Sequence, residues 1–296
     1  MRAYVDQRVE DFAAADSAAG AATEILGLST PELIRRGMNA IYRCDDVVLR
    51  VATPNAAASV SLDLAAMLRK EGVPVARPAS SEVIEHRGHA VTAWEYVVAT
   101  GEPIDWRAVG AIVRSVHEIP LDRVPPGVPT PSPTDFPWWD HDALLADVVD
   151  LLDVDARRGL ADAIDRHRGW REWAPSDEVL CHGDVHPGNV IMAAEGPVLV
   201  DWDLLCRAPR GWDHGPMMSW TERWGGAPGV YDAMAQGAGW SARGDRFGES
   251  VAELRLVSAT LMRLKVSRHL PAARAESIRR LEYWRGDPVP AIWNAQ

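Results

Sequence analysis

The chain has 296 residues, of which 47% are hydrophobic and 25% are charged, so we expect a packed, enzyme-sized protein rather than a disordered one. A formal net charge of −11 argues against nucleic acid as a partner, because phosphate binding needs clustered positive charge, and is compatible with a cationic small-molecule ligand. No apolar stretch approaches the roughly 20 residues that span a membrane. The three cysteines have no metal-ligand spacing and fit a reducing cytoplasm. The sequence leaves the oligomeric state open.

The first half of the expected small unit is β-rich. Residues 5–26 have alanine-rich helical faces, and the strand-forming stretch 32–54 contains a two-residue turn, Asp45-Asp46, that predicts a hairpin. Alternation in the second strand of that hairpin puts Arg50 on the face opposite to the most apolar positions. Because a charged group in an apolar strand needs a partner, Arg50 is a candidate functional residue.

A helix and a second hairpin are expected next. An apolar stripe predicts a helix that stops at Gly72, and its members are Val60, Leu64, Met67 and Leu68. The second hairpin turns at Arg87-Gly88. Further along the chain we expect helices at 105–119, 140–153, 155–169, 246–268 and 271–282. The proline-rich stretch 125–139 between two of them is interpreted as a surface loop that extends over a cleft.

The most informative segment, 179–203, contains three polar residues in an order that phosphoryl transfer explains. That chemistry needs a base near the attacking hydroxyl and Mg²⁺ ligands near the phosphates, and kinase loops place a metal-binding Asn five residues after the catalytic Asp. Asp184 and Asn189 have this offset, and Asp201 follows a short apolar run, as the second metal-binding Asp of kinases follows a strand. We therefore predict Asp184 as the catalytic base and Asn189 and Asp201 as Mg²⁺ ligands, with His182 holding the loop by hydrogen bonds.

A different metal chemistry is the alternative for the same segment. His182, Asp184 and His186 alternate in a pattern that a transition-metal-dependent hydrolase could use. This interpretation leaves Asn189 and the strand before Asp201 unexplained, so the kinase interpretation is preferred.

The motif HGDVHPGN followed by VLVDWD, together with APRGWDHG at 208–215, resembles the aminoglycoside phosphotransferase family, which also contains choline and homoserine kinases. The resemblance implies an α+β, two-lobed, protein-kinase-like fold, with a small β-rich N-lobe at 1–98 and a larger, mostly helical C-lobe at 99–296. It also implies an enzyme that uses Mg²⁺ to transfer the γ-phosphoryl group of ATP, or of GTP, to a hydroxyl of a small acceptor such as an aminoglycoside-like antibiotic, amino sugar or amino alcohol.

The resemblance assigns roles in nucleotide binding as well. Arg50 stands where kinases carry a phosphate-contacting Lys, and Asp63 is expected to be its ion-pair partner. Independently of the resemblance, Gly37 opens the first hairpin and is a position where the backbone can approach a phosphate, with an ordinary turn as the alternative. Glu95 and Val97 lie where a hinge binds adenine through backbone groups. Asp203 is interpreted as a further metal or substrate contact, with a helix cap or salt bridge as the alternative.

The acceptor site is expected after Asp203, where aromatic and acidic residues gather. The candidates are Trp212, Trp220, Glu222 and Trp224, with Asp232 and Trp240 beyond them. Tryptophan faces beside carboxylates suit an amine or a sugar, and helix packing is the alternative role for each tryptophan. A second function, a nucleotide-binding pseudokinase that acts as an adaptor or sensor, is favoured by the departures at Arg50 and Asp63 and opposed by the intact Asp184, Asn189 and Asp201.

Overall fold

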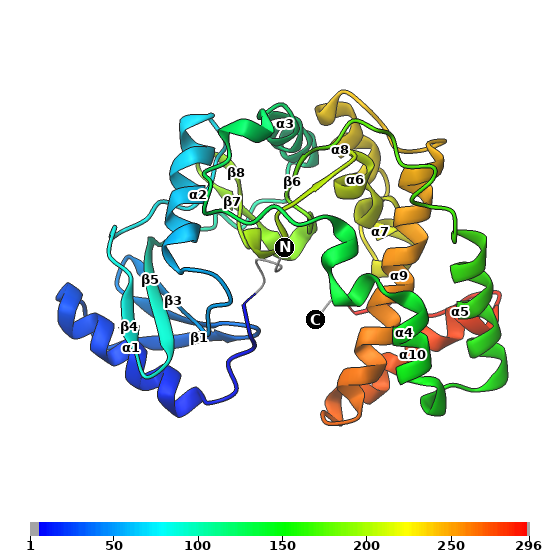
Figure 1. Cartoon of the computed structure of the whole chain (residues 1–296), viewed down its shortest axis with the longest axis horizontal. Coiled ribbons are helices and arrows are strands. Elements are labelled where there is room, and N and C mark those ends of the chain that lie inside the picture. The colour runs from blue at the N-terminus through cyan, green and yellow to red at the C-terminus, as the bar shows by residue number, and fades with distance from the viewer. Residues whose placement is uncertain (1–5, 295–296) are drawn as a thin grey trace.

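The computed structural model describes residues 6–294 and has two lobes, one built on a β-sheet and one on helices (Figure 1). The N-lobe sheet is antiparallel with the order β1-β2-β3-β5-β4. Its strands are β1 (Glu32–Arg36), β2 (Ala40–Cys44), β3 (Val47–Ala52), β4 (Ile84–His86) and β5 (His89–Glu95). The two hairpins and their turns are confirmed, with left-handed backbone at Asp45, Arg87 and Gly88.

Helix α1 (Phe12–Leu26) covers the outer face of this sheet. Asp11 caps its first turn and Gly27 ends it in a left-handed conformation, whereas the sequence predicted a start at residue 5, which lies outside the described residues. Its alanines pack on Leu49 and Val51, so the predicted alternation in β3 is confirmed and Arg50 lies on the opposite face.

Helix α2 (Ser59–Lys70) packs between the sheet and the C-lobe. The predicted stripe of Val60, Leu64, Met67 and Leu68 is buried in a core that continues into α3 (Trp106–His117) of the C-lobe. A backbone bridge between Val75 and Leu199 also joins the two lobes. The chain itself passes between them in the segment 96–105, which follows β5 and precedes α3.

The C-lobe is helical, with α9 (Arg246–Ser267) in contact with α4 (His141–Asp147), α5 (Val154–Arg166), α6 (Gly211–Met218) and α10 (Ala272–Arg285). The remaining helices are α7 (Trp220–Trp224) and α8 (Val230–Ala238). Glycines allow α3 and α8 to cross closely, since a Cβ at Gly110 would lie 1.9 Å from the Met234 carbonyl oxygen.

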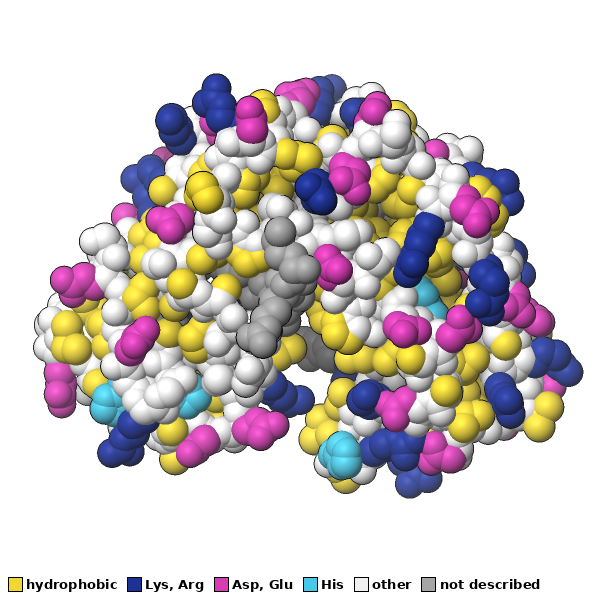
Figure 2. All heavy atoms as spheres, viewed as in Figure 1, with side chains coloured by type: hydrophobic (Ala, Val, Ile, Leu, Met, Phe, Trp, Pro, Cys, Tyr) yellow, Lys and Arg dark blue, Asp and Glu magenta, His cyan; other side chains and the backbone are white. Residues whose placement is uncertain are grey.

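The surface carries charges of both signs. On the face shown in Figure 2, acidic and basic side chains are interspersed over both lobes, with apolar side chains between them. Among the described residues on this face, the net charge of −11 is therefore not gathered into one acidic patch. No helix within 6–294 has both the length and the apolar character that a membrane span requires.

Two sequence-based expectations in the C-lobe are wrong. The helix expected at 140–153 ends at Asp147 and gives way to a 3-10 turn, Val149–Leu151. The stretch 125–139 is not a loop lying over the cleft, because Phe136 and Trp139 are 2% and 3% exposed and pack in the core. Two further 3-10 turns, Pro133–Asp135 and Pro137–Trp139, fold this stretch against the helices, and Leu121–Arg123 forms another after α3. The other predicted helices are confirmed within a few residues.

Candidate active site

Two short antiparallel strand pairs position the polar motif between the lobes. Strand β6 (Val179–Cys181) pairs with β9 (Cys206–Ala208), and β7 (Val190–Ala193) pairs with β8 (Gly196–Leu199). The loop 182–189 leaves β6, and Asp201 follows β8. The two strand pairs therefore bring together residues that are separated in sequence by the β7–β8 hairpin.

Asp213 on α6 anchors the start of the loop. Its carboxylate is fully buried and accepts hydrogen bonds from the backbone N–H groups of His182 at 3.0 Å and Gly183 at 2.7 Å. Nε2 of His117 lies 3.0 Å from the same carboxylate. Burial alone raises the pKa of Asp213, but the His117 hydrogen bond and charge outweigh it, so the pKa lies below its ordinary value and the carboxylate is ionised. Sequence reasoning included Asp213 in a matching segment but gave it no role.

The two residues before Asp184 have structural roles. Gly183 has a φ of 88°, and a Cβ there would lie 1.9 Å from the carbonyl oxygen of Leu204, so only glycine fits. His182 is buried, its Nδ1 accepts from the Asp184 amide at 3.2 Å, and its Nε2 lies 3.1 Å from the Val200 carbonyl oxygen. These partners require the neutral tautomer with the proton on Nε2, and burial lowers the pKa of His182 accordingly. The predicted loop-holding role of His182 agrees with this geometry.

Asp184 lies at the centre of a set of donors. Asn189 Nδ2 donates to its carboxylate at 3.3 Å, and His186 Nε2 and Arg255 Nη2 lie 3.4 and 3.3 Å from its two oxygens. Arg255, on α9, also donates to the Gly183 carbonyl oxygen. Burial raises the pKa of Asp184, but the His186 hydrogen bond and the Arg255 charge outweigh it and hold the pKa well below its usual range. Sequence reasoning missed Arg255, which is 71 residues away and carries no local signal.

Asp201 and Asn189 offer oxygen atoms that the protein leaves free. Asp201 lies in the left-handed region, with φ 65°, and among the described residues no donor bonds its carboxylate. Its pKa is raised, first by burial and then by the Asp184 charge. Asn189 directs its Nδ2 to Asp184 and leaves Oδ1 without a donor within 6–294. Carboxylate and amide oxygens of this kind are the ligands that Mg²⁺ prefers.

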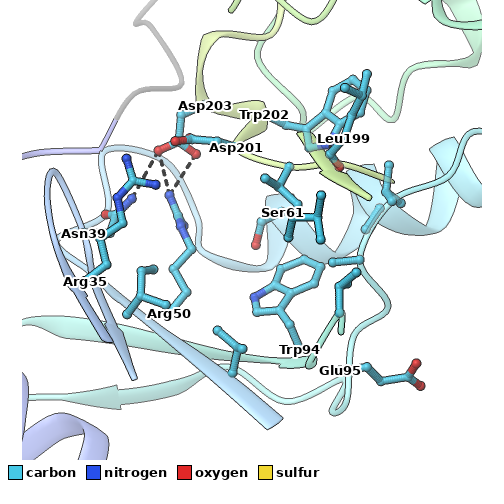
Figure 3. Close-up of a pocket in the computed structure, with 18 of the residues that line it drawn as sticks. Arg35, Asn39, Arg50, Ser61, Trp94, Glu95, Leu199, Asp201, Trp202 and Asp203 are labelled. Atoms are coloured by element: carbon cyan, nitrogen blue, oxygen red, sulfur yellow. Dashed lines mark hydrogen bonds and ion pairs between the residues drawn. The ribbon is translucent and has the colours of Figure 1, made fainter. Parts of the chain in front are cut away.

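Arg50 pairs with Asp203 instead of with Asp63. Its Nη2 lies 2.7 Å from Asp203 Oδ2, and Asn39 also donates to Asp203 (Figure 3). The same nitrogen lies 2.7 Å from Asp6 Oδ2. Asp63 is exposed on the opposite side of α2, so the expected ion pair is wrong. The reason is geometric, because α2 turns Ser61 rather than Asp63 toward the cavity. The salt-bridge alternative for Asp203 is the arrangement found.

A cavity of about 450 Å³ lies between the sheet and the C-lobe. Apolar side chains from both lobes line it, including Ile41, Val48, Trp94, Leu199 and Trp202, and its polar edge carries Gly37, Arg50, Asp201 and Asp203. The Glu95 side chain points away from the cavity (Figure 3), and the Glu95 amide donates to the Arg77 carbonyl oxygen. In the described part of the chain the half-buried amide of Val97 donates to no acceptor, which leaves it available to a ligand. A Cβ at Gly37 meets nothing closer than 3.9 Å, so its glycine is not required by packing.

A second cavity, of about 240 Å³, opens on the other side of Asp184. Two of the residues predicted to contact the acceptor, Trp220 and Trp224, line this cavity. Sequence reasoning did not include the other lining residues Trp138, His186, Ser219, Arg255 and Met262. Trp212 is wrong as a substrate contact, because it is 1% exposed and packs against Trp139. Glu222 is also wrong, since its side chain is exposed and lies outside the cavity lining. Beyond them, Asp232 pairs with Arg243 and Trp240 packs on His214.

The geometry does not support the hydrolase alternative. Both nitrogens of His182 have backbone partners, so that side chain has no lone pair for a metal. His117, Cys181 and Asp213 approach one another within 4.8 Å, the one such group found in 6–294, but backbone amides already occupy both oxygens of Asp213. Burial also raises the pKa of the Cys181 thiol, which keeps it protonated. This cluster therefore serves to anchor the loop.

Comparisons with known proteins agree with the geometry. A family model described as the phosphotransferase enzyme family matches residues 36–247. No curated protein matches the sequence. Among solved structures, a spectinomycin phosphotransferase in complex with ADP and spectinomycin has a TM-score of 0.67 at 17% identity, covering 90% of this chain and 94% of that one. A choline/ethanolamine kinase family protein from Mesorhizobium loti gives 0.63 at 19% identity, with 92% of each chain covered. An aminoglycoside 2'-phosphotransferase-IIIa in complex with GDP gives 0.68 at 14% identity, covering 92% and 97%. The expected α+β, protein-kinase-like fold is thereby confirmed.

Proposed function

The chain belongs to the phosphotransferase enzyme family, and from that membership we propose that it transfers the γ-phosphoryl group of ATP, with Mg²⁺, to a hydroxyl of a small-molecule acceptor. The observation that carries the proposal is that the loop 182–189 borders both cavities, with Gly188 in the lining of the larger one and Asp184 in that of the smaller one. Asp184 lines the smaller cavity, and Asp201, which lines the larger one, is close enough for the Asp184 charge to raise its pKa. A phosphoryl donor in one cavity and a hydroxyl in the other would meet at this boundary.

The larger cavity suits a nucleoside triphosphate. Its apolar walls, including Val48 and Leu199, would enclose the flat base, and the Val97 amide would donate a hydrogen bond to the base edge. Arg50 stands at the opposite, polar edge and would bring positive charge to the phosphates. The purine is not specified by these contacts, and ATP is proposed over GTP on the family resemblance alone.

The free oxygens at the polar edge fit a hard divalent cation. Asp201 would bind it through its unpaired carboxylate and Asn189 through Oδ1, while Asp203, already bound by Arg50, would contribute less. When bound, Mg²⁺ supplies charge that neutralises the phosphates during transfer. Three carboxylates, those of Asp184, Asp201 and Asp203, lie close together in the cleft. Among the described residues, basic side chains pair with Asp184 and Asp203 but not with Asp201, and a bound cation would balance this remaining charge.

Asp184 orients the acceptor hydroxyl. Because its pKa lies well below the usual range, it is a weak base in the resting enzyme, and its main task is to hold the hydroxyl in line with the phosphoryl group. It receives the proton late, as the new P–O bond forms, which agrees with the loose transition state of phosphoryl transfer. The pseudokinase alternative offers no reason for a fixed carboxylate at this boundary.

The test is phosphoryl transfer across an acceptor panel, measured together with nucleotide binding. Asp184→Asn should keep ATP affinity and lose about 10²–10⁴-fold in kcat. Asp201→Ala should lose the Mg²⁺ dependence of nucleotide binding, because it removes a charged ligand. Asp162→Asn, an exposed change on α5, is the control and should match the parent. Turnover by Asp184→Asn within about threefold of the parent would contradict the assignment.

A further inference from the structure

The smaller cavity has a chemistry that limits the acceptor. On the basis of the function proposed above, we propose that the acceptor is an uncharged or anionic hydroxy compound with a flat apolar body, not a polyamine. Three features of the cavity support this: its walls, its charges and one arginine with donors to spare.

The walls are aromatic and apolar. His186, Trp220 and Trp224 form a near-parallel stack, with ring centroids 5.9 and 5.5 Å apart, and Trp138, Leu256 and Met262 complete the lining. Such surfaces favour a planar or hydrocarbon body, because they offer area and few hydrogen bonds. A volume of about 240 Å³ is at the small end for ligand cavities, so a body of one or two rings is favoured.

The charges around the cavity oppose a cation. Asp184 is the one carboxylate among the described lining residues, and it is already bound by Arg255 and His186. Behind the aromatic stack, the Arg280 guanidinium lies 4.9 Å from the Trp224 ring centroid and so occupies the cation–π position there. An ammonium group in the cavity would therefore lie beside Arg255 and find no unpaired carboxylate among the described lining residues.

Arg255 supplies what an oxygen-bearing acceptor needs. Its Nη2 holds the Gly183 carbonyl and Asp184, while Nε and Nη1 donate to no residue within 6–294. The side chain is 13% exposed and rests with its guanidinium 5.5 Å from the buried Trp212 ring, so its direction is set. A carbonyl or carboxylate oxygen on the acceptor would accept hydrogen bonds from Nε and Nη1 of Arg255.

The experiment compares three probes with one frame and different charge: 4-(hydroxymethyl)benzamide, 4-(hydroxymethyl)benzoate and 4-(aminomethyl)benzyl alcohol as its ammonium form. Binding to the Mg²⁺ complex with a non-hydrolysable ATP analogue is followed by saturation-transfer NMR and tryptophan fluorescence. Because these readouts need no phosphoryl transfer, a failure of the proposed activity and a failure of the charge preference give different results. The neutral and carboxylate probes should bind about tenfold or more tightly than the ammonium probe.

Variants assign the preference to named residues. Arg255→Met should weaken binding of the carboxylate probe about tenfold or more and that of the benzamide by a smaller factor, because the first loses a hydrogen bond between charged groups and the second one to a neutral carbonyl. Arg274→Met, an exposed change on α10, should alter neither. Ser219→Asp should shift the preference toward the ammonium probe, because it adds an anionic side chain to the cavity lining, and urea unfolding checks that this variant folds. Ammonium binding equal to or tighter than that of the other two probes, or no binding by either of them, overturns the proposal.

Discussion

Replacing Gly183 with alanine tests the construction of the catalytic loop most directly. Gly183 has a φ of 88°, which by itself costs an alanine about 1–2 kcal/mol. The added Cβ would also lie 1.9 Å from the Leu204 carbonyl oxygen and 2.7 Å from its carbonyl carbon, both backbone atoms. Backbone cannot rotate away as a side-chain end can, so one of the two segments must shift by about 1 Å.

The shift has two measurable consequences. Gly183 is bonded to Asp213 through its amide and to Arg255 through its carbonyl, and Leu204 follows directly after Asp203. Gly183→Ala should therefore lower the free energy of unfolding by about 2–4 kcal/mol, more than the strain of the φ angle alone. It should also lower kcat about 100-fold, because displacement of a catalytic group by about 1 Å has that effect.

Urea unfolding and phosphoryl-transfer assays read these two effects, and Gly286→Ala is the matched control. Gly286 has a φ of 82°, and no atom lies within 4 Å of the position that an alanine Cβ would take, so its substitution isolates the conformational strain of about 1–2 kcal/mol. Adding Leu204→Ala to Gly183→Ala should not rescue it, since the clash is with backbone. Equal destabilisation of Gly183→Ala and Gly286→Ala would refute the reasoning.

Two other predictions concern ionic contacts. Arg50→Ala should raise the KM for ATP and lower kcat, and Arg50→Lys should recover part of both. Double-mutant cycles on these kinetics should show a coupling of about 1–3 kcal/mol between Arg50→Ala and Asp203→Asn and none between Arg50→Ala and Asp63→Asn. Additive effects in the Asp203 cycle would contradict the ion pair. Glu253 on α9 bonds His167 and Arg166 at the end of α5, and although burial raises its pKa, these contacts outweigh it and leave the pKa below its ordinary value. A carboxylate whose pKa is lower in the folded state stabilises the protein at a pH above its pKa in the unfolded chain, and this contribution is lost as the pH falls toward its pKa in the folded protein. The free energy of unfolding should therefore decrease below about pH 4.5, and Glu253→Gln should make that decrease less steep. An unchanged slope in that variant would show that Glu253 does not carry it.

The parts of the site that sequence could predict are those that depend on short spacing. Asp184 and Asn189 are five residues apart on one loop, and the Asn189 amide bonds Asp184 in the structure, so the motif and the contact coincide. Arg50 was identified because a charge in an apolar strand is visible in the alternation of its neighbours. The partner of Arg50 was not identified correctly, because the sequence does not show which way Asp63 points from α2. In the structure α2 turns Asp63 away, and Asp203 forms the ion pair.

The smaller cavity, which we propose as the acceptor site, shows the limit of sequence-based prediction in physical terms. It draws Trp138 from a 3-10 turn, Trp220 from α7 and Arg255 from α9, so no single stretch contains its pattern. A tryptophan that packs a core and one that lines a cavity have the same sequence signature, and Trp212 and Trp220 differ only in whether the face of their helix meets the core or the cavity. The overall charge of −11 was compatible with a cationic ligand, yet the one carboxylate among the described residues that line the cavity, Asp184, is already paired with Arg255. Local charge acts at contact distance and whole-chain charge is screened beyond about 8 Å at physiological salt, so we expect the charges of this cavity, and not the net charge, to select the proposed acceptor.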